Sequence, residues 1–302
     1  MDSAPTLTSD TLWAAAQQTT VHAIACGALQ SINTEFTLLE AGGIRFLVRI
    51  LANIARKEAA AKRRAQQAPQ GKPHNPFLPY EPDLFVGHVS DTHLCLLNKF
   101  NVVDHHLLLV TRHYESQDTW LKEADFAALA VGLGAIPGLG FYNGGHIAGA
   151  SQHHKHLQLV PLPFAAGDPL PIDTLIAQQG HLDPHQPCPL PVPFHAIAIG
   201  LPVDWTQPAP AIAPLLWQRY RQLLAYLGLD LEGSQPNVPY NLLVTREWML
   251  AVPRSRDRYW DIPINSLGYA GSLLVRDGVG LSRLKAIGPL RLLTEVGYPA
   301  RR

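Results

Sequence analysis

The sequence contains little cysteine and has no excess of charge of either sign. Its 302 residues include only Cys26, Cys95 and Cys188, which lie far apart and form no Cys-x-x-Cys pair. This pattern suggests neither a disulfide framework nor a thiolate zinc site. The 24 basic residues balance the 24 acidic ones. A neutral chain argues against duplex nucleic acid or an anionic membrane as the main partner, although a local basic pocket could still bind polyphosphate.

Long apolar runs are missing as well. No segment reaches the ~18 apolar residues that a membrane span needs. The first residues lack the basic region and apolar core of a secretion signal. We therefore expect a cytoplasmic protein that binds neither a membrane nor nucleic acid. Apolar residues make up 47% of the chain, enough for a sizeable core in one large or two small domains.

Chemically useful side chains gather in residues 151–161. His154, His156 and Gln158 alternate there with apolar or basic residues, which predicts a strand with two imidazoles and a carboxamide on one face. The preceding segment, residues 142–150, is rich in glycine and could bring backbone N–H groups close to an anion. A phosphate cradle that leads into a row of histidines suggests phosphoryl or nucleotidyl transfer through a histidine nucleophile.

These residues resemble the active-site strand of the histidine-triad superfamily in its transferase form, in which glutamine replaces the third histidine. More narrowly, Asn143-Gly-Gly, Ser151-Gln and His154-Lys-His-Leu-Gln158 resemble the family of diadenosine tetraphosphate phosphorylase, also called ATP adenylyltransferase. Three further segments resemble other parts of that family: residues 98–111 its strand–turn–strand before the active site, and residues 240–254 and 265–271 its C-terminal region.

The resemblance implies a role for each residue of the strand. His156 holds the place of the nucleophile, and a nearby backbone carbonyl is expected to fix its tautomer. His154 would bind a phosphate oxygen or buttress His156. Gln158 can donate to a phosphate oxygen but cannot act as an acid or base, which favours capture of the intermediate by phosphate. His153 stands where the family commonly has a small residue or proline, so the shape of this loop is left open.

The remaining candidates would bind the nucleotide or its phosphates. Lys99 could equally be an ordinary exposed lysine, and the Asn-Gly pair at 143–144 is also a routine turn signal. Most of the basic run at 57–64 is expected to be the solvated end of a helix, with Lys57 as the exception. The full set is Asn98, Lys99, Asn143, Gly144, Gly145, Ser151, Gln152, Lys57 and Arg254.

A metal site is the competing interpretation of the histidines. Two histidines two residues apart on a strand can bind zinc, with His146 or His153 as a third ligand. Gln158 is a poor zinc ligand, however, and the segment has no carboxylate. We therefore expect no metal held by the protein and no tightly bound cofactor. Mg²⁺ is instead expected to arrive with the nucleotide.

The expected activity is reversible phosphorolysis of diadenosine tetraphosphate, a dinucleoside polyphosphate, to ATP and ADP through a covalent AMP–histidine. One rival is another histidine-triad transferase, such as a hexose-phosphate uridylyltransferase. The absence of cysteine-based zinc spacing and the C-terminal match weigh against it. Another rival is a nucleotide-binding sensor without catalysis. The oligomeric state is left open.

Hairpin-like strands mixed with separate helices indicate the α+β class. The resemblance implies an antiparallel histidine-triad sheet with helices mainly on one face, and a C-terminal extension that completes the pocket. We expect a single domain, with a core at 43–161, a proline-rich connection at 162–212 and a C-terminal part at 213–302. Helices are expected at 9–30, 51–67, 118–133, 212–228 and 281–286, and strands at 43–50, 84–89, 93–98, 106–112, 155–161, 240–245, 248–253 and 272–275.

Overall fold

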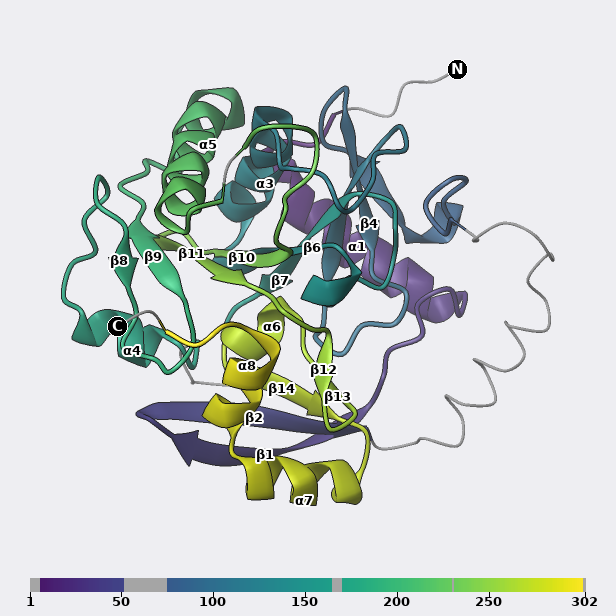
Figure 1. The fold of residues 1–302 in the computed structure, drawn as a ribbon. Helices are drawn as coiled ribbons and strands as arrows, with labels where there is room; N and C mark the ends of the chain where they lie inside the picture. Colours follow the sequence, from purple (N-terminus) through teal and green to yellow (C-terminus); the bar gives the residue numbers. More distant parts are fainter. Residues whose placement is uncertain (1–5, 52–74, 165–169, 230, 301–302) are drawn as a thin grey trace.

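The computed structural model describes residues 6–51, 75–164, 170–229 and 231–300, and a nine-stranded sheet runs through its centre (Figure 1). Every neighbouring pair in the sheet is antiparallel. In spatial order the strands are β3 (Phe85–His88), β4 (His93–Leu97), β5 (Leu107–Thr111), β7 (His156–Pro161), β6 (Gly138–Gly144), β10 (Tyr240–Val244), β11 (Trp248–Pro253), β9 (Ile197–Gly200) and β8 (Cys188–Pro189).

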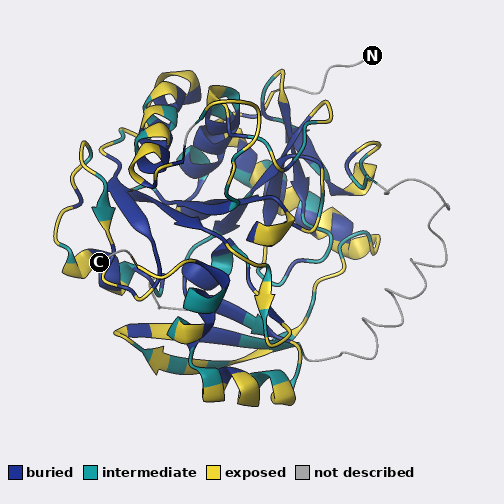
Figure 2. Cartoon of the chain, in the orientation of Figure 1, coloured by how far each residue is buried: buried dark blue, intermediate teal, exposed yellow. Residues whose placement is uncertain are grey.

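Three helices cover one face of this sheet: α1 (Ser9–Ala25), α3 (Glu123–Ala135) and α5 (Ala209–Tyr226). Their apolar side chains form a core with Leu157 and Leu159 of β7, and Figure 2 shows how deeply the strands are buried. Because side chains alternate along a strand, β7 must direct His156 and Gln158 to the opposite face. The expected α+β class, with an antiparallel sheet and helices mainly on one face, is confirmed.

A smaller layer covers part of the opposite face. It contains β1 (Thr34–Ala41), β2 (Ile44–Leu51) and β14 (Ser272–Val275), with β1 antiparallel and β14 parallel to β2. Phe46 and Val48 of β2 share a second core with Phe141 of β6 and Val160 of β7. Short elements complete this layer and the loops: α4 (Asp173–Gln178), α6 (Ser266–Tyr269), α7 (Gly278–Ile287), α8 (Pro289–Val296), β12 (Arg258–Tyr259), β13 (Ile262–Pro263) and the 3₁₀ turns η1 (Pro82–Leu84) and η2 (His146–Ala148).

The C-terminal third is part of the main sheet rather than an appendage to it. β10 pairs with β6 so that Asn241 lies opposite Asn143. The proline-rich connection also contributes, because β9 at Ile197–Gly200 pairs with β11. We expected few regular elements there. A four-residue strand is too short for its alternation to be recognised in the sequence.

Several expected boundaries differ from the observed ones. The helix expected from Asp118 begins at Glu123, where Asp125 accepts the Lys122 N–H at 2.6 Å, so Asp118 is not its cap. β1 and α8 were not expected at all. The helix expected at 51–67 lies outside the described residues, except for Leu51, which ends β2. Among the described residues, no helix combines the length and apolar character needed to cross a membrane.

Candidate active site

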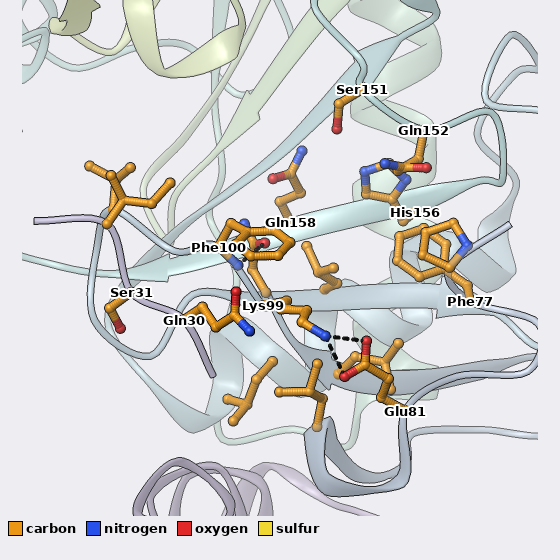
Figure 3. Close-up of a pocket in the computed structure, with 18 of the residues that line it drawn as sticks. Gln30, Ser31, Phe77, Glu81, Lys99, Phe100, Ser151, Gln152, His156 and Gln158 are labelled. Atoms are coloured by element: carbon orange, nitrogen blue, oxygen red, sulfur yellow. Dashed lines mark hydrogen bonds and ion pairs between the residues drawn. The ribbon is translucent and has the colours of Figure 1, made fainter. Parts of the chain in front are cut away.

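A cavity of about 750 Å³ opens on the sheet face opposite α1 and α3 (Figure 3). Leu96 and Leu108, from β4 and β5, give it an apolar floor beside His156 and Gln158 of β7. A largely apolar cavity with a few convergent polar groups is typical of small-molecule sites. Six of the residues expected from the sequence line it: Asn98, Lys99, Ser151, Gln152, His156 and Gln158.

His156 is the first residue of β7, and its ring is held in one tautomer. Nδ1 lies 2.8 Å from the carbonyl oxygen of His154 and must donate to it, which leaves the lone pair on Nε2. The expected backbone carbonyl is therefore present. Burial lowers the pKa of His156 to about 4. The imidazole is thus neutral near pH 7, which is its nucleophilic form.

Gln117 fixes the backbone of His156. Its side-chain Oε1 accepts the His156 N–H at 2.8 Å, while its Nε2 donates to the carbonyls of Asn143 at 2.9 Å and His156 at 3.2 Å. Gln117 is buried, so it joins β6 and β7 where water is absent. It was not among our candidates, because a single glutamine in a loop carries no recognisable sequence signal.

His154 lies just before β7 and is buried, and it does not line the cavity. Its Nε2 donates to the Thr111 carbonyl at 2.9 Å, and its Nδ1 accepts from Asn75 Nδ2 at 3.0 Å. Phe77 packs against both imidazoles, with ring centroids 5.7 Å from His154 and 5.3 Å from His156. Of the two roles expected for His154, this geometry favours the buttress over a phosphate contact.

Gln158 lies two residues after His156 on the same face of β7. Its Oε1 is 2.9 Å from Nε2 of His106, a buried residue just before β5. Burial lowers the pKa of His106 to about 4, so this ring is neutral as well. His106 falls within the 98–111 segment that carried the resemblance, but no pattern in that segment separates it from its neighbours.

Lys99 forms an ion pair with Glu81 at the cavity, with Nζ–O distances of 2.5 and 2.7 Å (Figure 3, dashed lines). Both side chains are partly exposed, so the pair is exchangeable. A phosphate would therefore have to compete with the Glu81 carboxylate for Lys99. Glu81 was not expected, since it lies in a proline-rich segment with no recognisable pattern.

Asn143, Gly144 and Gly145 do not line the cavity. The Asn143 Oδ1 accepts from Asn241 Nδ2 at 2.9 Å and from both the N–H and the hydroxyl of Ser266, at 2.9 and 2.8 Å. The N–H groups of Gly145, Ala148, Gly149 and Ala150 donate to carbonyls of the same loop. We expected these residues to cradle phosphate. The geometry instead gives the loop a structural role, because these four N–H groups are used internally, and the loop delivers Ser151 and Gln152 to the cavity.

Gly145 shows why this loop needs glycine. Its φ of +88° is one that side chains rarely adopt, and a Cβ there would collide with the carboxylate of Asp118. At Gly145, the glycine in this sequence pattern therefore reflects a tight turn.

Arg254 is completely buried, and it was expected to bind phosphate. Burial lowers the pKa of its guanidinium. A guanidinium has five N–H donors, and every one is matched by an acceptor within the protein. The acceptors are the carbonyls of Val296, Ala148, Arg256 and Ile264 and Oδ1 of Asn241. Arg254 therefore ties the C-terminal segment to the sheet. Lys57 lies outside the described residues.

The two histidines are not arranged as a metal-binding pair, since both ring nitrogens of His154 are hydrogen-bonded within the protein. Within the described residues, the group with metal-ligand spacing is a different one, the exposed His22, Cys26 and Asp83.

Solved structures share the fold. The structure of yeast Ap4A phosphorylase Apa2 in complex with AMP superposes with a TM-score of 0.76 and 26% identity, covering 98% of this chain and 99% of that one. The same yeast protein in complex with Ap4A gives a TM-score of 0.78 at 24% identity, covering 98% and 100%. The fold and the histidine strand define an enzyme of histidine-triad-like architecture.

Sequence comparisons narrow the class. The chain is 29% identical over 266 residues to diadenosine 5',5'''-P1,P4-tetraphosphate phosphorylase 2 of Saccharomyces cerevisiae, covering 80% of this chain and 81% of the relative. Protein APA1 of the same yeast is 28% identical over 294 residues, covering 90% of each. The family model of the Ap4A phosphorylase N-terminal domain matches residues 2–178, and that of the ATP adenylyltransferase C-terminal domain matches residues 190–299. The chain belongs to the Ap4A phosphorylase (ATP adenylyltransferase) family.

Proposed function

We propose that the protein cleaves diadenosine tetraphosphate with inorganic phosphate, producing ATP and ADP, and that an AMP–His156 intermediate carries the reaction. The observation that supports this most directly is the neutral ring of His156. Its Nδ1–H is engaged with the His154 carbonyl, and Nε2 is left as the nucleophile beside a cavity. Membership of the family supplies the substrate class.

The reaction has two displacements. Nε2 of His156 attacks the α-phosphorus, a P–N bond forms, and the P–O bond to the leaving ATP breaks. A phosphate oxygen then attacks the same phosphorus, the P–N bond breaks, and ADP leaves. The ring becomes positively charged while AMP is attached. The His154 carbonyl, which accepts from Nδ1, stabilises that charge. Two inversions leave the configuration at phosphorus retained.

Other residues of the cavity would bind and orient the substrate. Gln158 would donate from its amide to a phosphate oxygen, and the hydroxyl of Ser151 and the amide of Gln152 would do the same. The leucine-lined floor near Asn98 suits a nucleoside. Lys57 and Lys99 are the proposed cationic ligands of the polyphosphate.

Mg²⁺ would enter with the substrate. Among the described lining residues Glu81 is the only carboxylate, and it is paired with Lys99. These residues do not make a set of oxygen ligands for Mg²⁺, which commonly keeps several waters and binds phosphate oxygens. The ion would offset part of the charge of the polyphosphate.

The decisive experiment is incubation of the purified protein with diadenosine tetraphosphate and Mg²⁺, with and without phosphate, followed by chromatography. We expect ATP and ADP in equal amounts, and only when phosphate is present. ATP and AMP formed at the same rate without phosphate would indicate a hydrolase. Tight binding without turnover would indicate a sensor. Exchange of UDP-hexose with hexose phosphate in a parallel reaction would indicate a uridylyltransferase.

The covalent step has its own test. A brief reaction with labelled substrate in the absence of phosphate should leave an adenylate on residues 151–161. A phosphoramidate is labile to acid and stable to alkali, unlike a serine ester. Label on a serine or lysine peptide would reject His156 as the nucleophile.

A further inference from the structure

His106, just before β5, and Gln158 of the neighbouring strand β7 face one another. Leu108 of β5 pairs with Gln158 of β7, so His106, two residues before Leu108, lies diagonally across from Gln158 on the same face. The two side chains meet with His106 Nε2 2.9 Å from Gln158 Oε1. His106 is buried, and the ring of Phe141 packs against it with centroids 5.9 Å apart. Burial and the Phe141 ring therefore hold the His106 side of the contact in place.

A chain of hydrogen bonds determines which side chain donates and which accepts in this contact. It starts at the backbone N–H of Phe100, which lies 3.3 Å from Oδ1 of Asn98 and can only donate. The Asn98 amide is therefore turned with its NH₂ group toward His106, where Nδ2 lies 3.2 Å from Nδ1. In a neutral imidazole one nitrogen accepts and the other donates. Nδ1 accepts here, so Nε2 carries the hydrogen.

The order of donors and acceptors continues from His106 to Gln158. Since His106 Nε2–H donates, it meets the carbonyl oxygen of the Gln158 side chain, and the NH₂ group of Gln158 is left for the cavity. With the opposite tautomer, Gln158 would donate to His106 and turn its oxygen toward the polyphosphate. An oxygen acceptor facing phosphate oxygens would repel them, whereas an NH₂ group stabilises the negative charge in the transition state.

We propose that His106 is a positioning residue that fixes the Gln158 carboxamide with its NH₂ group directed at the reacting phosphate. The catalytic consequence of this arrangement rests on the proposed function. The arrangement itself does not, so the two can fail separately. The neutral state of His106, which burial maintains, preserves the direction of the chain at physiological pH.

The first test reads the tautomer in the unmodified protein. Imidazole ¹⁵N shifts distinguish a protonated from an unprotonated ring nitrogen. The chain has 14 histidines, so the His106 signals are assigned by their loss in His106→Gln. We expect the Nε2–H tautomer at pH 7, whether or not the protein turns over any substrate. An Nδ1–H tautomer, or a doubly protonated ring, would overturn the proposal.

The second test is a double-mutant cycle. His106→Leu removes the donor, and His106→Gln keeps an N–H near the position of Nε2. Loss of one hydrogen bond corresponds to a decrease in kcat of roughly 3- to 10-fold, with KM nearly unchanged. We expect His106→Gln to recover most of that loss. In a Gln158→Ala background, His106→Leu should cause no further decrease.

Equal losses in both backgrounds, or His106→Gln as impaired as His106→Leu in folded protein, would refute a role through Gln158. Thermal unfolding of each variant serves as the control for folding. Should His106→Leu fail to fold, the tautomer of the unmodified protein decides the question.

Discussion

Lys155 and His156, two consecutive residues where strand β7 begins, point to opposite faces of the sheet and carry different chemistry. On the cavity face, His156 is neutral, and its partners are the backbone carbonyl of His154 and the side-chain amide of Gln117. On the other face, Lys155 is fully buried, with Nζ 3.0 Å from Glu115 Oε2, 3.4 Å from Asp125 Oδ2 and 2.8 Å from the Trp120 carbonyl. His93 joins this cluster through its contact with Asp125 Oδ1 at 3.0 Å.

The difference indicates that one face stabilises the strand and the other carries out the reaction. The charged cluster joins β7 to β4, α3 and the loop before α3, and so holds the strand in place. The neutral face is held by hydrogen bonds that set tautomers and leave one lone pair for chemistry. Because Lys155 and His156 are adjacent, the two roles can be separated: a substitution at 155 should mainly lower stability, and a substitution at 156 should mainly lower activity.

The largest expected effect is the loss of activity in His156→Ala. Turnover should fall by more than ~1000-fold, because no other group on the cavity face can form the covalent intermediate. The thermal unfolding temperature should change little by comparison. Initial rates of diadenosine tetraphosphate phosphorolysis give the measurement. His153→Ala, which removes an exposed neighbouring histidine, is the matched control and should remain active. A His156→Ala enzyme with a tenth of the normal rate would contradict the assignment.

Lys155→Met should have the reverse profile, with a loss of stability of about 3–5 kcal/mol, because it removes the buried amino group that pairs with the Glu115 and Asp125 carboxylates. Urea unfolding measures it. Lys122 offers a matched control, since it also pairs with Glu115, at 2.8 Å, but is 62% exposed. Lys122→Met should cost less than about 1 kcal/mol. Similar losses in the two variants would show that burial of the cluster does not govern its contribution.

The two neutral histidines should also make the stability of the folded protein depend on pH. His156 and His106 have pKa values lowered to about 4 in the folded protein, from 6.5. Between those values the unfolded chain binds protons that the folded protein does not, so stability is fully present above pH 6.5 and is lost as pH falls toward 4. From pH 7 to 5.5 the two histidines together should cost about 2 kcal/mol.

Urea unfolding at several pH values measures this loss, and His106→Gln should remove about half of it. The rate of adenylate formation in a single turnover supplies a second readout. It should not follow a titration with a midpoint near 6.5. A midpoint there would mean that the nucleophile is solvated and that the burial argument fails.

The sequence identified residues that line the cavity better than it identified the residues that hold them in place. His156 and Gln158 were identified because alternation along a short strand is visible in the residues themselves. Gln117, Asn75 and His106 were not identified, since each acts through a partner that is distant in the sequence. Arg254 illustrates the same limit. It was selected as a cation near a motif, but its role depends on five acceptors that only the folded chain brings together.

The fold shows a similar contrast. Long helices and paired strands were predicted close to their observed positions, because periodicity over many residues is a strong signal. β9 was missed because its four residues are too few. The edge strand β1 was missed because polar residues interrupt its apolar ones and none of its residues is fully buried. The joining of β10 to β6 is a long-range pairing that no local pattern could indicate.

The smallest expected effect, and the sharpest probe of the neutral face, concerns the choice between phosphate and water. Gln158 has an amide that can donate but cannot exchange a proton during the reaction. Gln158→His would place an imidazole beside the adenylate, where it could accept a proton from attacking water. We expect the ratio of AMP to ADP formed at fixed phosphate to rise a few-fold, even if the total rate falls. Chromatography of the products gives this ratio directly.

Gln158→Asn is the matched control, because it also disturbs the contact with His106 but supplies no base, so it should slow the reaction without changing the ratio. If Gln158→His is folded and active and its ratio equals that of the unmodified enzyme, glutamine does not separate transfer from hydrolysis here. The selectivity would then belong to a dedicated phosphate subsite. Lys57 would be its first candidate, because the donors of Arg254 are already occupied within the protein.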